Sequence, residues 1–101
     1  MTGFPMEVGR VVRSRAGRDE VRCMMVLELE DEQYVRVADG DLRKLEKPKR
    51  KKIRHLHATP ALLLEVAEKL SGGRPVENAD IRKALAAAGY WNRGDESGEE
   101  G

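Results

Sequence analysis

Residues 21–30 place the strongest constraint on the fold, because apolar side chains alternate along them. The odd positions are all apolar, and several even positions are charged. A period of two places successive side chains on opposite faces of a strand, so this segment predicts a half-buried β-strand. Met24 and Val26 interrupt the polar side. We therefore expect the middle of that second face to be covered as well.

Strand-like segments with turn signals lie on both sides of this strand. Residues 7–15 are rich in β-branched side chains, and residues 34–38 alternate with Val35 and Val37 on one face. Residues 16–20 read as a hairpin loop in which Gly17 is free to take a positive φ, so Gly17 is a predicted structural turn residue. Asp39–Gly40 is a second strong turn signal.

Two shorter elements are expected to complete the sheet. Leu42 and Leu45 suggest a short fourth element, and residues 53–56 suggest a fifth strand. Several short strands closed by tight turns are typical of a small barrel, since closure removes exposed edge strands. The predicted fold is therefore mainly β, a barrel of about five strands over residues 1–57.

The remaining chain has the spacing of two short helices, over residues 58–92. Thr59 is a good N-cap, Pro60 suits the first helical position, and residues 71–73 end the first helix. Asn78 can cap the second helix, which Gly89 ends. The apolar positions at helical spacing are Leu62, Leu63, Val66, Ala67 and Leu70, then Ile81, Leu85 and Ala88. We expect the helices to cap or flank the barrel, and the acidic, glycine-rich residues 93–101 to be disordered.

The net charge of +1 conceals a strongly basic segment. Residues 1–57 carry fourteen Lys or Arg against ten Asp or Glu, whereas residues 58–101 carry five against eight. Most of the excess lies in one run that contains a single acidic residue, Glu46. Its cations are Arg43, Lys44, Lys47, Lys49, Arg50, Lys51, Lys52 and Arg54. Such runs usually contact a polyanion, the alternative being a solvated loop, and Pro48 keeps this one extended.

Several function classes find no support in the residues. No apolar run is long enough to span a membrane and no signal peptide is visible, so a cytoplasmic protein is expected. Cys23 is the only cysteine. We expect it to be a small buried apolar side chain. Together with His55 and His57 it supplies only three ligands, and a structural zinc site normally has four. No metal, other cofactor or small-molecule substrate is expected.

Catalysis and DNA reading by a helix-turn-helix are also disfavoured. The carboxylates at residues 28–32 have no nucleophile or histidine paired with them at a defensible spacing, so we expect solvated surface and no enzyme. The connection between the two helices, residues 71–78, is about twice as long as a helix-turn-helix allows. Aromatic rings are scarce. Tyr34 is expected in the core or at its rim, with an outward position beside Arg36 as the alternative, and Tyr90–Trp91 are expected to pack the second helix against the barrel.

Residues 6–57 resemble a KOW motif. The resemblance is carried by Glu7-Val-Gly-Arg-Val-Val-Arg-Ser-Arg-Ala-Gly17, by Met24-Met-Val-Leu-Glu-Leu29, and by Tyr34-Val-Arg-Val-Ala-Asp-Gly40. The continuation from Asp41 to Leu56 is similar to bacterial KOW-domain RNA-binding proteins. These are themselves similar to KOW-type large-subunit ribosomal proteins of archaea and eukaryotes.

The resemblance implies an SH3-like barrel that binds RNA, with ribosomal RNA as the expected partner and ribosomal proteins as possible neighbours. The loop of the first hairpin meets RNA in KOW domains, so the resemblance adds Arg13, Arg15 and Arg18 to the predicted contacts from the basic run. Two alternatives stay open. One is a transcription-elongation accessory factor of the NusG type, and the other is a protein–protein adaptor whose basic run meets an acidic partner.

Overall fold

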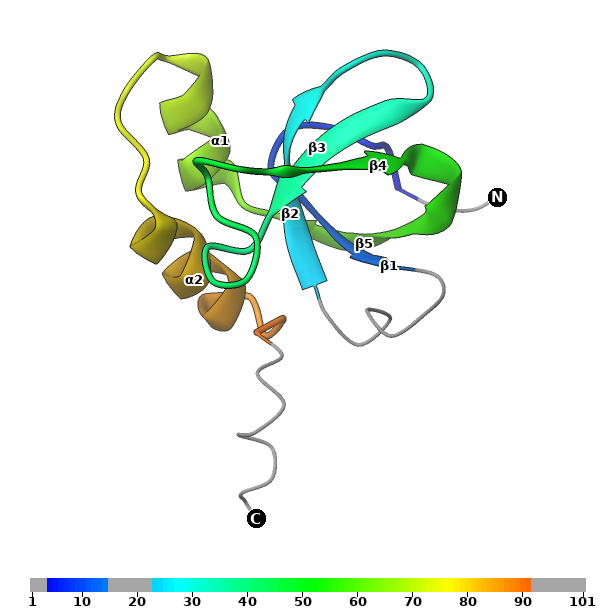
Figure 1. Cartoon of the computed structure of the whole chain (residues 1–101). Helices are drawn as coiled ribbons and strands as arrows, with labels where there is room; N and C mark the ends of the chain where they lie inside the picture. The colour runs from blue at the N-terminus through cyan, green and yellow to red at the C-terminus, as the bar shows by residue number, and fades with distance from the viewer. Residues whose placement is uncertain (1–3, 15–22, 92–101) are drawn as a thin grey trace.

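The computed structural model describes residues 4–14 and 23–91, which form one antiparallel sheet and two helices (Figure 1). The mainly β fold with two short helices is therefore confirmed. The hairpin loop with Gly17 and the acidic tail both lie outside the described residues. The elements are β1 (Arg10–Ser14), β2 (Cys23–Leu29), β3 (Tyr34–Ala38), β4 (Lys49–Lys52), the 3₁₀ turn η1 (Ile53–His55), β5 (Leu56–Leu62), α1 (Leu64–Ser71) and α2 (Asn78–Ala87).

The sheet is curled, because its two edge strands are joined by a very short link. Its five strands run β4-β3-β2-β1-β5, so β4 and β5 are the two edges. Only the three residues of η1 join these edge strands, and so short a link requires the sheet to bend until its edges approach each other. Among the described residues the ladders contain no β4–β5 pair. Closure into a complete barrel remains a prediction.

Both faces of β2 are buried, as the side chains at Met24 and Val26 predict. Met24 and Val26 belong to one core cluster, whereas Cys23 and Met25 belong to the other. The first cluster, called the inner core cluster below, contains only strand residues, from β1, β2, β3 and β5, so it lies on the face of the sheet away from the helices. The second is covered by the two helices, which lie together on one side of the sheet in Figure 1. The helix-covered cluster contains Val11, Cys23, Met25, Ala38, Leu63, Val66, Ile81 and Leu85.

The fourth and fifth strands differ from their predicted positions. Leu42 and Leu45 lie in the β3–β4 connection, and the fourth strand is instead Lys49–Lys52. These four cations are extended because their backbone pairs with β3, with Tyr34 opposite Lys52. The predicted strand at residues 53–56 was wrong in its start, because Ile53–His55 form η1 and β5 begins at Leu56.

The predicted start of the first helix at Thr59 was wrong. Thr59 lies in β5, and its hydroxyl Oγ1 donates a 2.8 Å hydrogen bond to the carbonyl oxygen of Val11. Pro60 follows on this edge strand, where a missing N–H can face away from the ladder. Helix α1 begins at Leu64. The N-cap signal at Thr59 is therefore overridden by pairing between β5 and β1.

The second helix begins one residue before its predicted start, because Asn78 is its first residue and not its cap. Glu77 is the N-cap and forms a capping box with Asp80, so the side chain of Asn78 is left for another contact. Gly89 has a φ of +85° and follows the helix end, as predicted. Tyr90 and Trp91 pack against the helix-covered core, which confirms their expected role. No helix in the described ranges is long and apolar enough to cross a membrane.

The Asp39–Gly40 turn predicts that replacing Gly40 by Ala lowers the unfolding free energy more than the same replacement at Gly73. Gly40 has a φ of +80°, and a Cβ there would lie 2.4 Å from the carbonyl oxygen of Asn78. Gly73 has a similar φ of +73° with no atom within 4 Å of such a Cβ. We expect Gly73→Ala to cost about 1–2 kcal/mol of unfolding free energy from backbone strain alone.

Gly40→Ala should cost clearly more than this matched control, because the methyl group also collides with the first turn of α2. Chemical denaturation of both variants measures the difference. Equal losses would contradict the close approach of the turn to α2.

Candidate nucleic-acid interface

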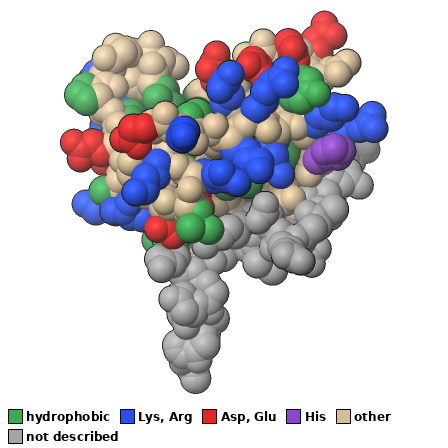
Figure 2. All heavy atoms as spheres, viewed as in Figure 1, with side chains coloured by type: hydrophobic (Ala, Val, Ile, Leu, Met, Phe, Trp, Pro, Cys, Tyr) green, Lys and Arg blue, Asp and Glu red, His purple; other side chains and the backbone are tan. Residues whose placement is uncertain are grey.

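Lys and Arg side chains gather on the face of the molecule shown in Figure 2. They lie across the middle of that view, in the region of β4, and acidic side chains lie along its upper rim. The structure divides the basic run among three elements. Arg43, Lys44 and Lys47 lie in the β3–β4 connection, Lys49–Lys52 form β4, and Arg54 lies in η1. The run is therefore extended only over Lys49–Lys52, where it is part of the sheet, and the prediction of an extended segment was wrong for the connection before it and for η1 after it.

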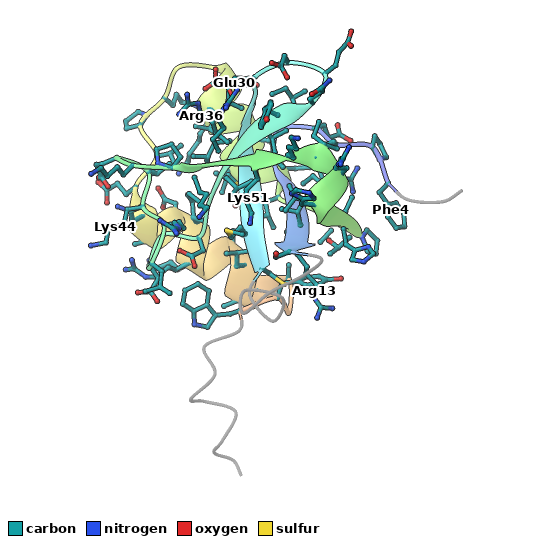
Figure 3. All side chains as sticks on the ribbon, turned by 45° about the vertical axis from the view of Figure 1, so that its right-hand side comes forward. Phe4, Arg13, Glu30, Arg36, Lys44 and Lys51 are labelled. Atoms are coloured by element: carbon teal, nitrogen blue, oxygen red, sulfur yellow. The ribbon has the colours of Figure 1, made fainter. Side chains whose placement is uncertain are left out.

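The alternation of β4 places its cations on two faces. Lys49 and Lys51 lie opposite Val37 and Val35, on the face of the inner core cluster. Arg50 and Lys52 lie opposite Arg36 and Tyr34, on the other face, because directly paired residues share a face. Figure 3 shows Lys51 on the opposite side of β4 from Arg36 and Glu30. The predicted single strip is thus two neighbouring surfaces.

The side chain of Asp39 shapes the connection that carries the first cations. Asp39 is buried, and its Oδ1 accepts hydrogen bonds from the backbone N–H of Asp41 at 2.8 Å and of Arg43 at 2.9 Å. The backbone N–H of Asp39 in turn donates to the carbonyl oxygen of Arg43. A buried carboxylate that accepts two backbone donors fixes a tight turn.

Helix α2 clamps the same connection. The side-chain oxygen of Asn78 accepts a 2.8 Å hydrogen bond from Leu45 N–H, and its amide nitrogen donates to Glu46 at 3.1 Å. This amide donor is the main reason that the pKa of Glu46 is below its ordinary value. Arg82 Nη1 donates to the carbonyl oxygen of Gly40 at 2.7 Å. The second helix therefore positions Arg43, Lys44 and Lys47.

On the other face of β4, Glu30 binds two arginines. Its Oε1 lies 2.7 Å from Arg50 Nε, and its Oε2 lies 2.9 Å from Arg36 Nη2. Glu28 lies 4.0 Å from Arg36, and the Arg50 guanidinium carbon lies 3.7 Å from the centre of the Tyr34 ring. The hydrogen bond from Arg50 is the main reason that the pKa of Glu30 is lowered, and the same bond raises the pKa of Arg50.

The cations predicted to contact RNA therefore differ in whether other side chains already engage them. Arg50 is engaged by Glu30 and Tyr34. Arg13 is exposed on β1, and Figure 3 shows it well apart from Lys44, so the structure does not bring these two together. Arg15 and Arg18 lie outside the described residues. Seven cations form no ion pair within the described part of the chain: Arg43, Lys44, Lys47, Lys49, Lys51, Lys52 and Arg54.

The sequence alone did not predict that Glu30 forms ion pairs with Arg36 and Arg50. Glu30 and Tyr34 flank the short β2–β3 connection, and the backbone N–H of Glu30 donates to Tyr34. Arg36 is opposite both Glu28 and Arg50 in the register. Strand alternation did place Tyr34 and Arg36 on one face, as the alternative to a core position for Tyr34, but the pairing of β4 was needed to bring in Arg50.

The remaining candidates for chemistry are Cys23, His55 and His57. Cys23 is buried as predicted, and burial raises the pKa of its thiol. His55 ends η1, whereas His57 lies in β5, and both are exposed. Within residues 4–14 and 23–91, no three His, Cys, Asp or Glu side chains are placed to hold a metal ion.

Neither a protein-family model nor a curated protein sequence matches this chain. The geometry of the described residues therefore carries the functional argument. Its main feature is a group of cations held on a sheet edge and on a clamped connection.

The Glu30 cluster predicts a pH-dependent contribution to stability. A lowered pKa in the folded state means that ionised Glu30 stabilises the fold above its ordinary pKa of 4.5, and that this contribution is lost as the pH falls through the folded-state pKa. We expect Glu30→Gln to reduce the unfolding free energy at pH 7. The deficit relative to the parent chain should shrink steadily below pH 4.5.

Glu32→Gln is the matched control, since Glu32 is exposed and forms no ion pair with the described residues. Urea denaturation across this pH range measures both variants. A deficit in Glu30→Gln that is the same at all pH values would contradict the ionic role of Glu30.

Proposed function

We propose that this chain binds RNA, without catalysis, through the basic residues of the β3–β4 connection, β4 and η1. The observation that carries the proposal is the set of seven cations that form no ion pair with described residues, on a backbone fixed by β3 and α2. Contacts between cations and phosphates release condensed counterions, which is the main source of affinity for a nucleic-acid backbone.

The fixed backbone beneath the cations supports this proposal. Lys49 and Lys51 are half-buried on a paired strand, a position in which a lysine stem can pack on the protein while its ammonium group reaches solvent. Arg43, Lys44 and Lys47 are exposed on a connection held by Asp39 and Asn78. A positioned cation loses less conformational freedom on binding than one on a mobile arm.

The resemblance of residues 6–57 to KOW proteins supports ribosomal RNA of the large subunit as the RNA, and it supports a cytoplasmic location. On this proposal, the chain sediments with large ribosomal subunits at low salt and is released at high salt. A transcription-elongation factor would instead co-purify with polymerase and show no ribosomal peak.

A second candidate follows from the position of β4. This strand pairs with β3 alone among the described strands, so one side of its backbone remains available to an added strand. An acidic, extended peptide would suit four successive cations, and such an adaptor would keep its partner after nuclease treatment. The charged edge also has a protective effect, because charge on an edge strand opposes aggregation.

The RNA proposal predicts the salt dependence of binding. For Lys49→Gln with Lys51→Gln, the slope of log affinity against log salt should become shallower by about 1.5 units, because two phosphate contacts are lost. The measurement is a fluorescence titration of a structured ribosomal RNA fragment over a series of salt concentrations.

The control is Arg74→Gln with Lys83→Gln, which removes the same charge from exposed positions beyond β5 that form no ion pair within the described ranges. The control should leave the slope nearly unchanged. Equal slopes in the two double variants would show that net charge alone, and not the surface at β4, governs binding.

A further inference from the structure

We propose that the outer face of the Arg50 guanidinium, supported by the Tyr34 ring, is a stacking site for one unpaired RNA base. This inference rests on the proposed RNA binding and adds a second mode of contact to it. Most of the cations proposed to bind phosphate lie on the β3–β4 connection and on the face of β4 that carries Lys49 and Lys51. The stacking site lies on the other face of β4.

The geometry makes Arg50 a fixed planar platform. Its guanidinium carbon is 3.7 Å from the centre of the Tyr34 ring, which is van der Waals contact between two flat groups. Its Nε donates a 2.7 Å hydrogen bond to Glu30, and such a bond lies near the guanidinium plane. The bond therefore fixes the orientation and covers neither face. Tyr34 lies on one face and the side chain is still 51% exposed. Its accessible surface must therefore lie mainly on the other face and along the edges, where a ligand can reach it.

The local charge favours a flat, uncharged ligand over a phosphate. Glu30 forms ion pairs with both Arg50 and Arg36. Asp31 and Glu32 are exposed on the adjoining β2–β3 connection. Carboxylates at this density repel phosphate, whereas a nucleobase can stack on a guanidinium plane or on an aromatic ring.

Cations next to the platform can hold the phosphates that flank such a base. Lys52 lies 5.9 Å from the centre of the Tyr34 ring, on the same face as Arg50. Lys52 and Arg54 also line a surface hollow together with Glu32, Gln33 and Ile53, and the amide of Gln33 can hydrogen-bond the edge of a base. An unpaired nucleotide can thus place its base on Arg50 and its backbone toward η1.

The test compares two RNA hairpins that differ by one unpaired, bulged nucleotide in an otherwise identical stem. The full chain should bind the bulged hairpin about tenfold more tightly, the usual scale for one stacked base. Arg50→Lys keeps the charge and removes the plane. It should abolish the preference and leave the salt dependence unchanged, and Tyr34→Leu should also weaken the preference.

Lys51→Gln is the matched control, because Lys51 neighbours Arg50 on the opposite face of β4. It should weaken binding to both hairpins equally and reduce the salt slope by about 0.8 units. Equal binding of the two hairpins by the parent chain would overturn the inference while leaving RNA binding intact. So would an Arg50→Lys variant that keeps the preference. Failure to bind either hairpin would overturn the proposed function itself.

Discussion

The burial of β2 on both faces is the constraint on which the rest of the structure depends. Met24 and Val26 face one way, Cys23 and Met25 face the other, and neither set can remain in water. A single flat sheet would cover neither face. The helices cover one face, and the curl of the sheet covers the other. The curl brings the chain from β4 to β5 in three residues and leaves β4 at an edge.

An edge strand with unpaired backbone groups needs protection from aggregation, and charged side chains provide it. The same cations supply the surface that we propose for RNA. Their position depends on α2, because Asn78 and Arg82 hold the connection that leads into β4. Both helices cover the core, and α2 also holds the connection that carries the first cations. Because the apolar side chains on both faces of β2 must be buried, the sheet curls and β4 becomes an edge strand. The burial of β2 thus decides where the Lys and Arg side chains of β4 lie.

The sequence predicted those elements whose signals are local. Alternation identified β2 and β3, and the apolar spacing identified the two helices. It could not place β4, because Lys49–Lys52 contain no apolar alternation and are extended only through pairing with β3. The start of α1 was missed for a related reason: Thr59 has the chemistry of an N-cap, but its hydroxyl bonds to Val11, far away in sequence.

The sequence named the cations of the candidate site, but it predicted only part of their arrangement in space. The cations of residues 43–54 are those that the structure places in the β3–β4 connection, β4 and η1. Their division between two faces, and the engagement of Arg50 by Glu30, follow from strand register. Register is set by contacts between distant segments. A count of charges along the chain therefore overstated how many of them are available to a polyanion.

The most direct test of the account is crosslinking of the full chain to RNA in cells, followed by identification of the crosslinked peptides and nucleotides. We predict crosslinks from residues 43–54 to nucleotides of large-subunit ribosomal RNA. Recovery of no RNA, or of crosslinks confined to α1 and α2, would contradict the claim that this basic surface contacts RNA.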